Sequence, residues 1–146
     1  MAHTGWIGTV ERLIEVCKDG EHGYREAARQ AARRDLQQFF GAQSKTRARF
    51  AEELRSEMSR LTDVNVSGSL AAAVHRGWMD LLARFGGGDE GLLSTVRQGE
   101  RRAILSYENA IQSPLPPEIE QLARRQLEEI KRAFKDLPGP DTTAAA

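Results

Sequence analysis

Apolar residues recur at helical spacing through the first part of the chain, and this feature constrains the fold more than any other. Intervals of four and three residues alternate through Trp6, Val10, Leu13, Cys17, Gly20, Tyr24, Ala27 and Ala31. This spacing places one apolar seam along an amphipathic helix, which must be buried against other elements. We therefore predict a long helix over 6–31. Because glycine disfavours a helix interior, Gly20 and Gly23 indicate points where a neighbouring helix approaches closely.

A second long helix is expected from Asp35, as its cap, to Leu61. The polar, β-branched residues 62–68 suit a connection between elements. A shorter helix should begin near Ser67 or Ser69 and end at the three glycines 86–88. Its apolar face is expected to include Leu70, Val74, Trp78, Leu81 and Phe85.

Two more long helices follow, the first with Asp89 as its expected cap. The proline-rich run 114–117 forces a turn and favours the start of the last helix, which should extend to Leu137. The inward seam of the helix expected at 35–61 is Leu36, Phe39, Phe40, Gln43, Arg47, Phe50, Leu54, Met58 and Leu61. The seams of the last two helices are Leu93, Val96, Glu100, Ala103, Tyr107 and Ala110, then Ile119, Leu122, Gln126, Ile130, Ala133, Phe134 and Leu137.

No segment has the pattern of a strand. Four long helices, two tight turns and one long connection containing a short helix are typical of an all-α, antiparallel, ferritin-like four-helix bundle. We expect this domain to occupy 1–137, with a disordered tail at 138–146.

Composition narrows the functional classes. The 21 basic and 21 acidic residues balance, which argues against nucleic acid or an anionic membrane as a partner. No signal peptide or membrane-spanning run is evident, so a cytoplasmic location is expected. Cys17 is the only cysteine, which excludes an internal disulfide and favours a buried small side chain.

Several segments carry a family resemblance. The stretch Gly68–Leu81 (GSLAAAVHRGWMDL) is supported by Asp19–Ala28, Phe50–Leu54, Gly99-Glu100 with Tyr107, and Arg125–Leu127. Together they resemble a family of small bacterial four-helix-bundle proteins that form a domain of unknown function. The resemblance implies a ferritin-like fold and a setting in stress physiology, but no activity.

Four polar residues fall on or beside the inward seams. Glu21 and Arg47 lie at similar distances from the first turn, as Glu100 and Gln126 do from the second. With both turns at the same end, the four would form one buried polar layer. Tyr24 and Tyr107 flank that layer and could donate hydrogen bonds into it.

This layer has three open interpretations. Ferritin-like di-iron proteins use inward Glu residues and two Glu-x-x-His pairs, whereas here Ser56 follows Glu53 by three residues and Glu129 follows Gln126 by three. We favour a buried ion-pair network without metal, because Arg47 would compete with a cation for the carboxylates. The alternatives are an iron or manganese site formed by Glu21, Glu53, Glu57 and Glu100, and a water-filled polar cavity.

The short helix offers a possible partner surface formed by His75, Arg76, Trp78 and Asp80. At its spacing, Trp78 is more typical of a core residue than of a recognition residue. The sequence therefore predicts a non-enzymatic helical protein that acts by binding another protein or by self-association. The alternatives are a metal-binding or oxidase-type protein with a degenerate ligand set, and small-molecule binding in the core.

Overall fold

All regular secondary structure in the part of the chain that the structure describes is helical. This computed structural model describes residues 5–63, 76–85 and 87–138, with the backbone alone at 76, 77, 79, 84 and 85. The helices are α1 (Gly5–Gln30), α2 (Arg34–Leu61), α4 (Arg76–Phe85), α5 (Gly88–Gln112) and α6 (Pro117–Lys135). No strand occurs within those ranges, which confirms the all-α class. The expected start of the short helix near Ser67 or Ser69 and the tail from 139 onward lie outside the described residues.

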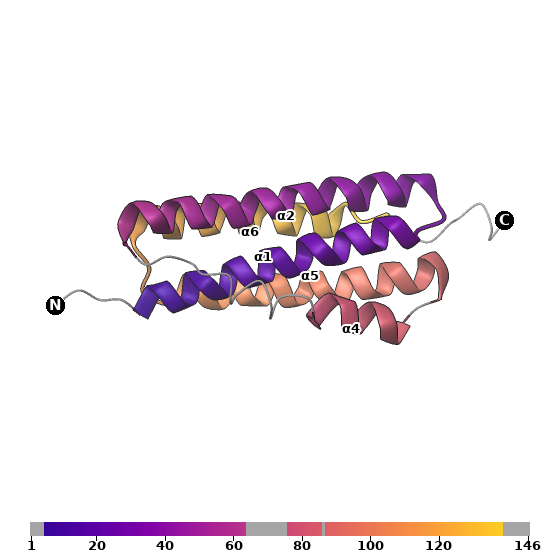
Figure 1. Cartoon of the computed structure of the whole chain (residues 1–146), viewed down its shortest axis with the longest axis horizontal. Helices are drawn as coiled ribbons and strands as arrows, with labels where there is room; N and C mark the ends of the chain where they lie inside the picture. The colour runs from indigo at the N-terminus through magenta and orange to yellow at the C-terminus, as the bar shows by residue number, and fades with distance from the viewer. Residues whose placement is uncertain (1–4, 64–75, 86, 139–146) are drawn as a thin grey trace.

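The long helices lie along one axis of the molecule (Figure 1). α1 and α2 run in opposite directions, and so do α5 and α6. The α1–α2 turn lies at the end where α5 begins, whereas the α5–α6 turn lies at the end where α1 begins (Figure 1). Our expectation that both turns share one end is therefore wrong. α2 ends and α5 begins at opposite ends of the molecule, so these two helices run in the same direction.

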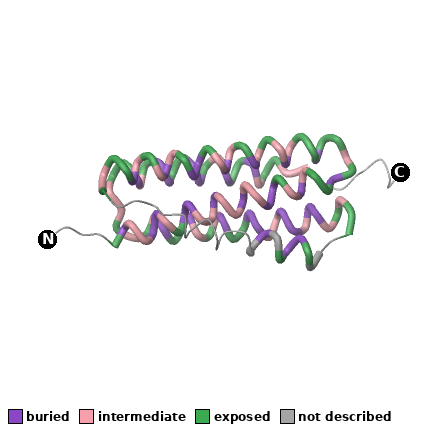
Figure 2. The backbone as a smooth tube through the Cα atoms, in the orientation of Figure 1, coloured by how far each residue is buried: buried purple, intermediate pink, exposed green. Residues whose placement is uncertain are grey.

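Each long helix packs mainly against two others. α1 and α6 each contact both α2 and α5, and α4 covers the junction between α1 and α5. Buried residues line the sides on which the helices face one another (Figure 2). They form two apolar clusters, one including Trp6, Leu13 and Phe50, the other including Phe40 and Trp78. Among the described helices, none has both the length and the apolar character that crossing a membrane requires.

The predicted seams are buried along the whole of α1 and α5. On α2, Phe39, Gln43 and Leu61 are only half-buried. On α6 the same holds for Phe134 and for Leu137, which follows the helix. These last two side chains line an open pocket between α5 and α6, and Leu137 also packs against the second apolar cluster.

Asp35 and Asp89, the two residues expected to cap helices, make other contacts. α2 begins one residue before Asp35, which pairs with Arg33 instead of capping the helix. α5 begins at Gly88, where φ is +69°, a conformation that glycine adopts without strain. Asp89 accepts hydrogen bonds from the backbone amides of Ala32 and Arg33, at 2.8 and 3.0 Å. Its carboxylate thus holds the α1–α2 turn against the start of α5.

Candidate functional site

An ion pair between Arg47 of α2 and Glu100 of α5 lies in the interior. Nη2 of Arg47 donates to Oε2 of Glu100 at 2.5 Å, and the two side chains are 1% and 0% exposed. Gly20 of α1 faces the same guanidinium, because a Cβ at this position would lie 3.3 Å from an Arg47 nitrogen. Three helices therefore meet at the pair, and the absence of a side chain at Gly20 gives Arg47 room.

The charge of Arg47 is fixed by its partner. Burial alone would lower the pKa of the guanidinium, since it removes the charged form from water. The charge and hydrogen bond of Glu100, together with smaller effects of Tyr24 and Cys17, outweigh burial, so the pKa of Arg47 lies above its ordinary value. Arg47 thus brings a permanent positive charge into the core, opposite Glu100.

Tyr24 of α1 connects this ion pair to the aromatic core. Its ring lies 5.4 Å from Cζ of Arg47, and its centroid lies 5.9 Å from Phe40 and 4.8 Å from Trp78. Burial raises the pKa of the Tyr24 phenol well above its ordinary value, and the negative charge of Glu100 raises it further. Tyr24 is therefore a neutral phenol held between a cation and two aromatic rings.

A second polar group joins all four long helices. Tyr107 of α5 donates to Oε1 of Gln126 at 2.6 Å, and its oxygen lies 3.0 Å from Sγ of Cys17. Because the phenol gives its one proton to Gln126, the thiol donates to the phenol oxygen. Nε2 of Gln126 donates to Glu53 at 3.0 Å and to the carbonyl of Phe50 at 3.2 Å. The chain of hydrogen bonds runs from α1 through α5 and α6 to α2.

This second group is not reactive at neutral pH. Burial raises the pKa of the Cys17 thiol to about 11. Burial, with the nearby Cys17 as a smaller cause, also raises the pKa of Tyr107 well above its ordinary value. Both groups keep their protons, and a protonated thiol is a poor nucleophile.

Glu21 does not join the interior layer in which we expected it. Its side chain, 13% exposed, pairs with Arg25 at 2.8 Å and Lys18 at 3.6 Å, both on its own helix. Its backbone carbonyl accepts a hydrogen bond from Ser44 of α2 at 2.8 Å. The seam of α1 passes through Gly20, one residue earlier, so Gly20 and not Glu21 faces Arg47.

The residues of the interior do not fit a metal centre. Among the described residues, no three His, Cys, Asp or Glu side chains gather closely enough to hold an ion. The alternative set Glu21, Glu53, Glu57 and Glu100 is therefore not brought together. Glu100 faces a cation, Glu53 binds an amide, and Glu57 pairs with Arg60 at 2.8 Å. No step through a metal can be derived from this donor set.

The short helix α4 is anchored by Trp78, which is only 3% exposed. The indole occupies a slot between α1 and α5, where a Cβ at Gly23 or at Gly99 would lie 2.4 Å from its ring atoms. The backbone amide of Trp78 also donates to Asp19 of α1 at 3.3 Å. Trp78 is thus a core residue and not part of a partner surface. Asp80 is exposed, and the side chains of His75 and Arg76 lie outside the described residues.

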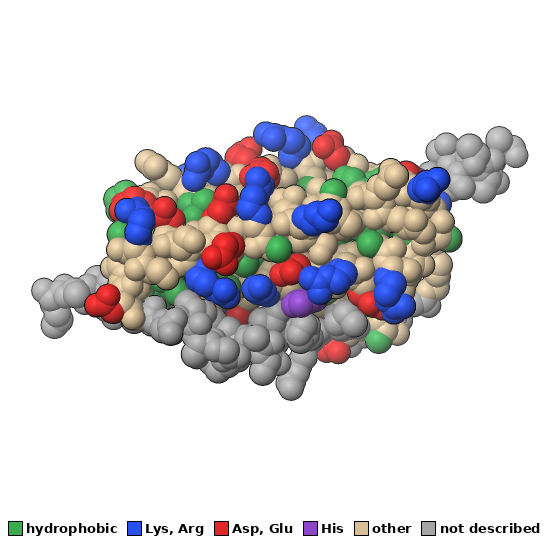
Figure 3. All heavy atoms as spheres, turned by 45° about the horizontal axis from the view of Figure 1, so that its top comes forward, with side chains coloured by type: hydrophobic (Ala, Val, Ile, Leu, Met, Phe, Trp, Pro, Cys, Tyr) green, Lys and Arg blue, Asp and Glu red, His purple; other side chains and the backbone are tan. Residues whose placement is uncertain are grey.

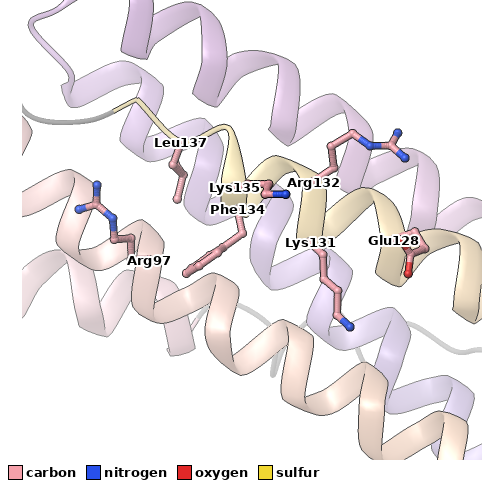
Figure 4. Close-up of a pocket in the computed structure, with 7 residues that line it drawn as sticks. All are labelled: Arg97, Glu128, Lys131, Arg132, Phe134, Lys135 and Leu137. Atoms are coloured by element: carbon pink, nitrogen blue, oxygen red, sulfur yellow. The ribbon is translucent and has the colours of Figure 1, made fainter.

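A basic pocket between α5 and α6 was missed by sequence reasoning. It measures about 690 Å³ and is lined by Arg97, Glu128, Lys131, Arg132, Phe134, Lys135 and Leu137. Phe134 extends from α6 toward α5, with Arg97 and Lys131 on either side (Figure 4). The guanidinium of Arg101 lies 5.6 Å from the Phe134 ring. In the sequence, this pocket is indicated by basic residues on the outward faces of two helices. These residues do not point to a shared pocket until it is known that α5 packs against α6.

Comparison with protein families identifies one family for this chain. Residues 6–113, which include α2, α4, α5 and nearly all of α1, match the model of a family described as a domain of unknown function (DUF2383). A search of curated proteins found no match. Because the matched residues make up well over half of the chain, the protein belongs to this family of unknown function, DUF2383.

Proposed function

We propose that this protein is a four-helix bundle of ferritin-like topology, with α4 as an extra helix in the long connection. The directions of the helices support the proposal, because two antiparallel pairs are related by one long connection that leaves α2 and α5 parallel. Ferritin-like folds have one such crossover connection.

The protein acts by binding another protein or a second copy of itself, and not by catalysis in its core. The Arg47–Glu100 pair carries this proposal. Ferritin-like di-iron proteins direct carboxylates and histidines into the middle of the bundle to hold two cations. Here the Arg47 guanidinium binds the Glu100 carboxylate through a charge-assisted hydrogen bond and repels any cation that approaches it. In this proposal the interior stabilises the fold, and the protein binds its partner through its surface.

Metal analysis and solution mass test this proposal together. Protein purified without chelator should carry less than about one-tenth of an equivalent of iron, manganese or zinc, because the donor set lacks the imidazole and free carboxylates those ions need. A di-iron ferritin-like protein purified in parallel controls for loss of metal. Light scattering coupled to gel filtration reports self-association. Stoichiometric metal in the parent that is lost in Glu100→Gln would overturn the proposal.

A further inference from the structure

The outer groove between α5 and α6 combines apolar and basic side chains along its length. The basic pocket at one end shares Lys131 with a second pocket of about 610 Å³. The second pocket is lined by Leu105, Glu108, Asn109, Ile111, Gln112, Arg124, Leu127 and Lys131. Lys131 of α6 borders both pockets and pairs with Glu108 of α5 at 3.5 Å where they meet, so the two adjoin along the α5–α6 junction. We call this pair of adjoining pockets the α5–α6 groove.

The apolar part of the groove is accessible. Leu105 is 58% exposed and is the one large hydrophobic side chain among the described residues with such exposure. At the other end, Phe134 and Leu137 are half-buried and line the basic pocket. An apolar strip between two helices is the kind of surface into which an amphipathic helix places its apolar face.

The charge of the groove selects the partner. Five basic and two acidic side chains line its two pockets, although the whole chain is neutral. Arg97, Arg132 and Lys135 make no ion pair within the described residues. By contrast, acidic and basic side chains alternate on the face seen in Figure 3. A second copy of this chain would bring a groove of the same sign, so an acidic partner is the complementary one.

We propose that the α5–α6 groove docks an acidic amphipathic helix of a partner protein. Apolar side chains of that helix lie against Leu105 and Phe134, and its carboxylates meet Arg97, Arg132 and Lys135. This inference rests on the proposed function, since it names the surface and the partner chemistry through which the bundle binds.

The probe is a fluorescein-labelled peptide of about 18 residues, with leucines and glutamates at helical i, i+4 spacing. Fluorescence anisotropy measures its binding to the whole chain at two salt concentrations. Arg97→Glu/Lys135→Glu should weaken binding at least about tenfold, because two favourable charge contacts become repulsive. The matched control, Arg12→Glu/Arg60→Glu, makes the same change of charge at exposed residues outside the groove lining and should change binding less than about threefold.

Leu105→Ser tests the apolar contact and should also weaken binding, with no change in the melting temperature because the side chain is exposed. Equal effects of the two double variants would reduce the binding to general charge attraction and overturn the inference. So would equal binding of a peptide whose leucines are replaced by serine, or the absence of binding. Competition by oligothymidine that the same variants abolish would assign the groove to nucleic acid instead.

A parent dimer that Leu105→Ser converts to a monomer would assign the groove to a second copy. That outcome overturns the acidic partner but leaves the proposed function intact. Stoichiometric metal at Glu100 would overturn the proposed function itself, so the two failures are distinguishable.

Discussion

Arg47 dominates the interior at the scale of single residues. A buried ion pair adds little net stability, because taking both charges out of water offsets most of their attraction. Removal of one partner is different, since it leaves the other charge buried and uncompensated. Glu100 is 0% exposed, so it cannot recover hydration without opening the core.

Arg47→Met should therefore lower the free energy of unfolding by about 3–5 kcal/mol. Adding Glu100→Gln removes the stranded charge, so the double variant should regain much of that loss, as coupled residues do. Urea unfolding of the parent, both single variants and the double variant measures the coupling. Arg49→Met is the control, because Arg49 pairs with Glu129 at the surface, where the two side chains are 53% and 43% exposed, and should cost less than about 1 kcal/mol. Additive losses across the Arg47 set would contradict a shared ion pair.

Helical spacing accounts for much of this site and fails in one instructive place. It put Arg47, Glu100 and Gln126 on inward seams, and all three side chains are buried. It could not assign Glu21, because a residue beside a seam can face either a neighbouring helix or solvent. Gly20 faces the interior in place of Glu21, because its missing side chain leaves room for Arg47. That fit depends on the approach of two helices, which one helix's spacing does not specify.

At the scale of elements, α4 is positioned by a ring and two glycines. Trp78 fills the slot between Gly23 of α1 and Gly99 of α5, so both helices must lack a Cβ there. A glycine inside a helix costs about 1 kcal/mol relative to alanine. That cost is offset here by burial of the indole against Tyr24 and the two helix backbones.

Gly99→Ala should destabilise the protein by about 1–3 kcal/mol, because the new methyl overlaps the indole and α4 must shift. Trp78→Ala alone should cost about 3–5 kcal/mol as a large-to-small core change. In the double variant the methyl has no ring to meet, so the Gly99→Ala penalty should disappear. Chemical denaturation followed by circular dichroism measures all three.

Gly8→Ala and Gly41→Ala are the matched controls, since a Cβ at either position meets nothing within 4 Å. Both should be neutral or stabilising by up to about 1 kcal/mol, through helix propensity alone. If Gly99→Ala behaves like these controls, the indole does not occupy the slot.

The presence of each helix could be predicted from the sequence, whereas the residues that cap the helices could not. Asp89 looks like a cap for its own helix, but its partners are Ala32 and Arg33, far away in sequence.

At the scale of the whole molecule, the interior contains three weak acids that are held neutral. Cys17, Tyr24 and Tyr107 are each at most 1% exposed, and burial raises the pKa of all three. The chain of hydrogen bonds from Cys17 to Glu53 crosses every long helix, so the protonation of this interior bears on how the helices hold together. The sequence identified Tyr24 and Tyr107 beside a polar layer. It treated Cys17 as a simple apolar residue, because its polar partner lies 90 residues away.

Stability should therefore fall in alkali, beginning near pH 9. In the unfolded chain the Cys17 thiol loses its proton near its ordinary pKa of 9.0, whereas the folded protein keeps it to about 11. A group whose pKa is raised on folding contributes fully below the unfolded value, and this contribution is lost as the pH rises through the folded value. Between the two values the loss amounts to about 1.4 kcal/mol per pH unit. The two tyrosines act in the same direction, but only above their ordinary pKa of 10.0.

Cys17→Ala separates the thiol from the phenols. A group with the same pKa in the folded and unfolded states does not make the free energy of unfolding depend on pH. The variant's free energy of unfolding should therefore change little with pH until the tyrosines begin to ionise. Urea unfolding at intervals between about pH 8 and pH 10 compares the two proteins, with the slope m showing that the same surface is exposed throughout. The quantity that matters is the difference between the curves as the pH rises, because the methyl substitution itself shifts the variant by a constant amount. Curves that stay parallel across this range would mean that the thiol ionises as readily in the folded protein as in the unfolded chain.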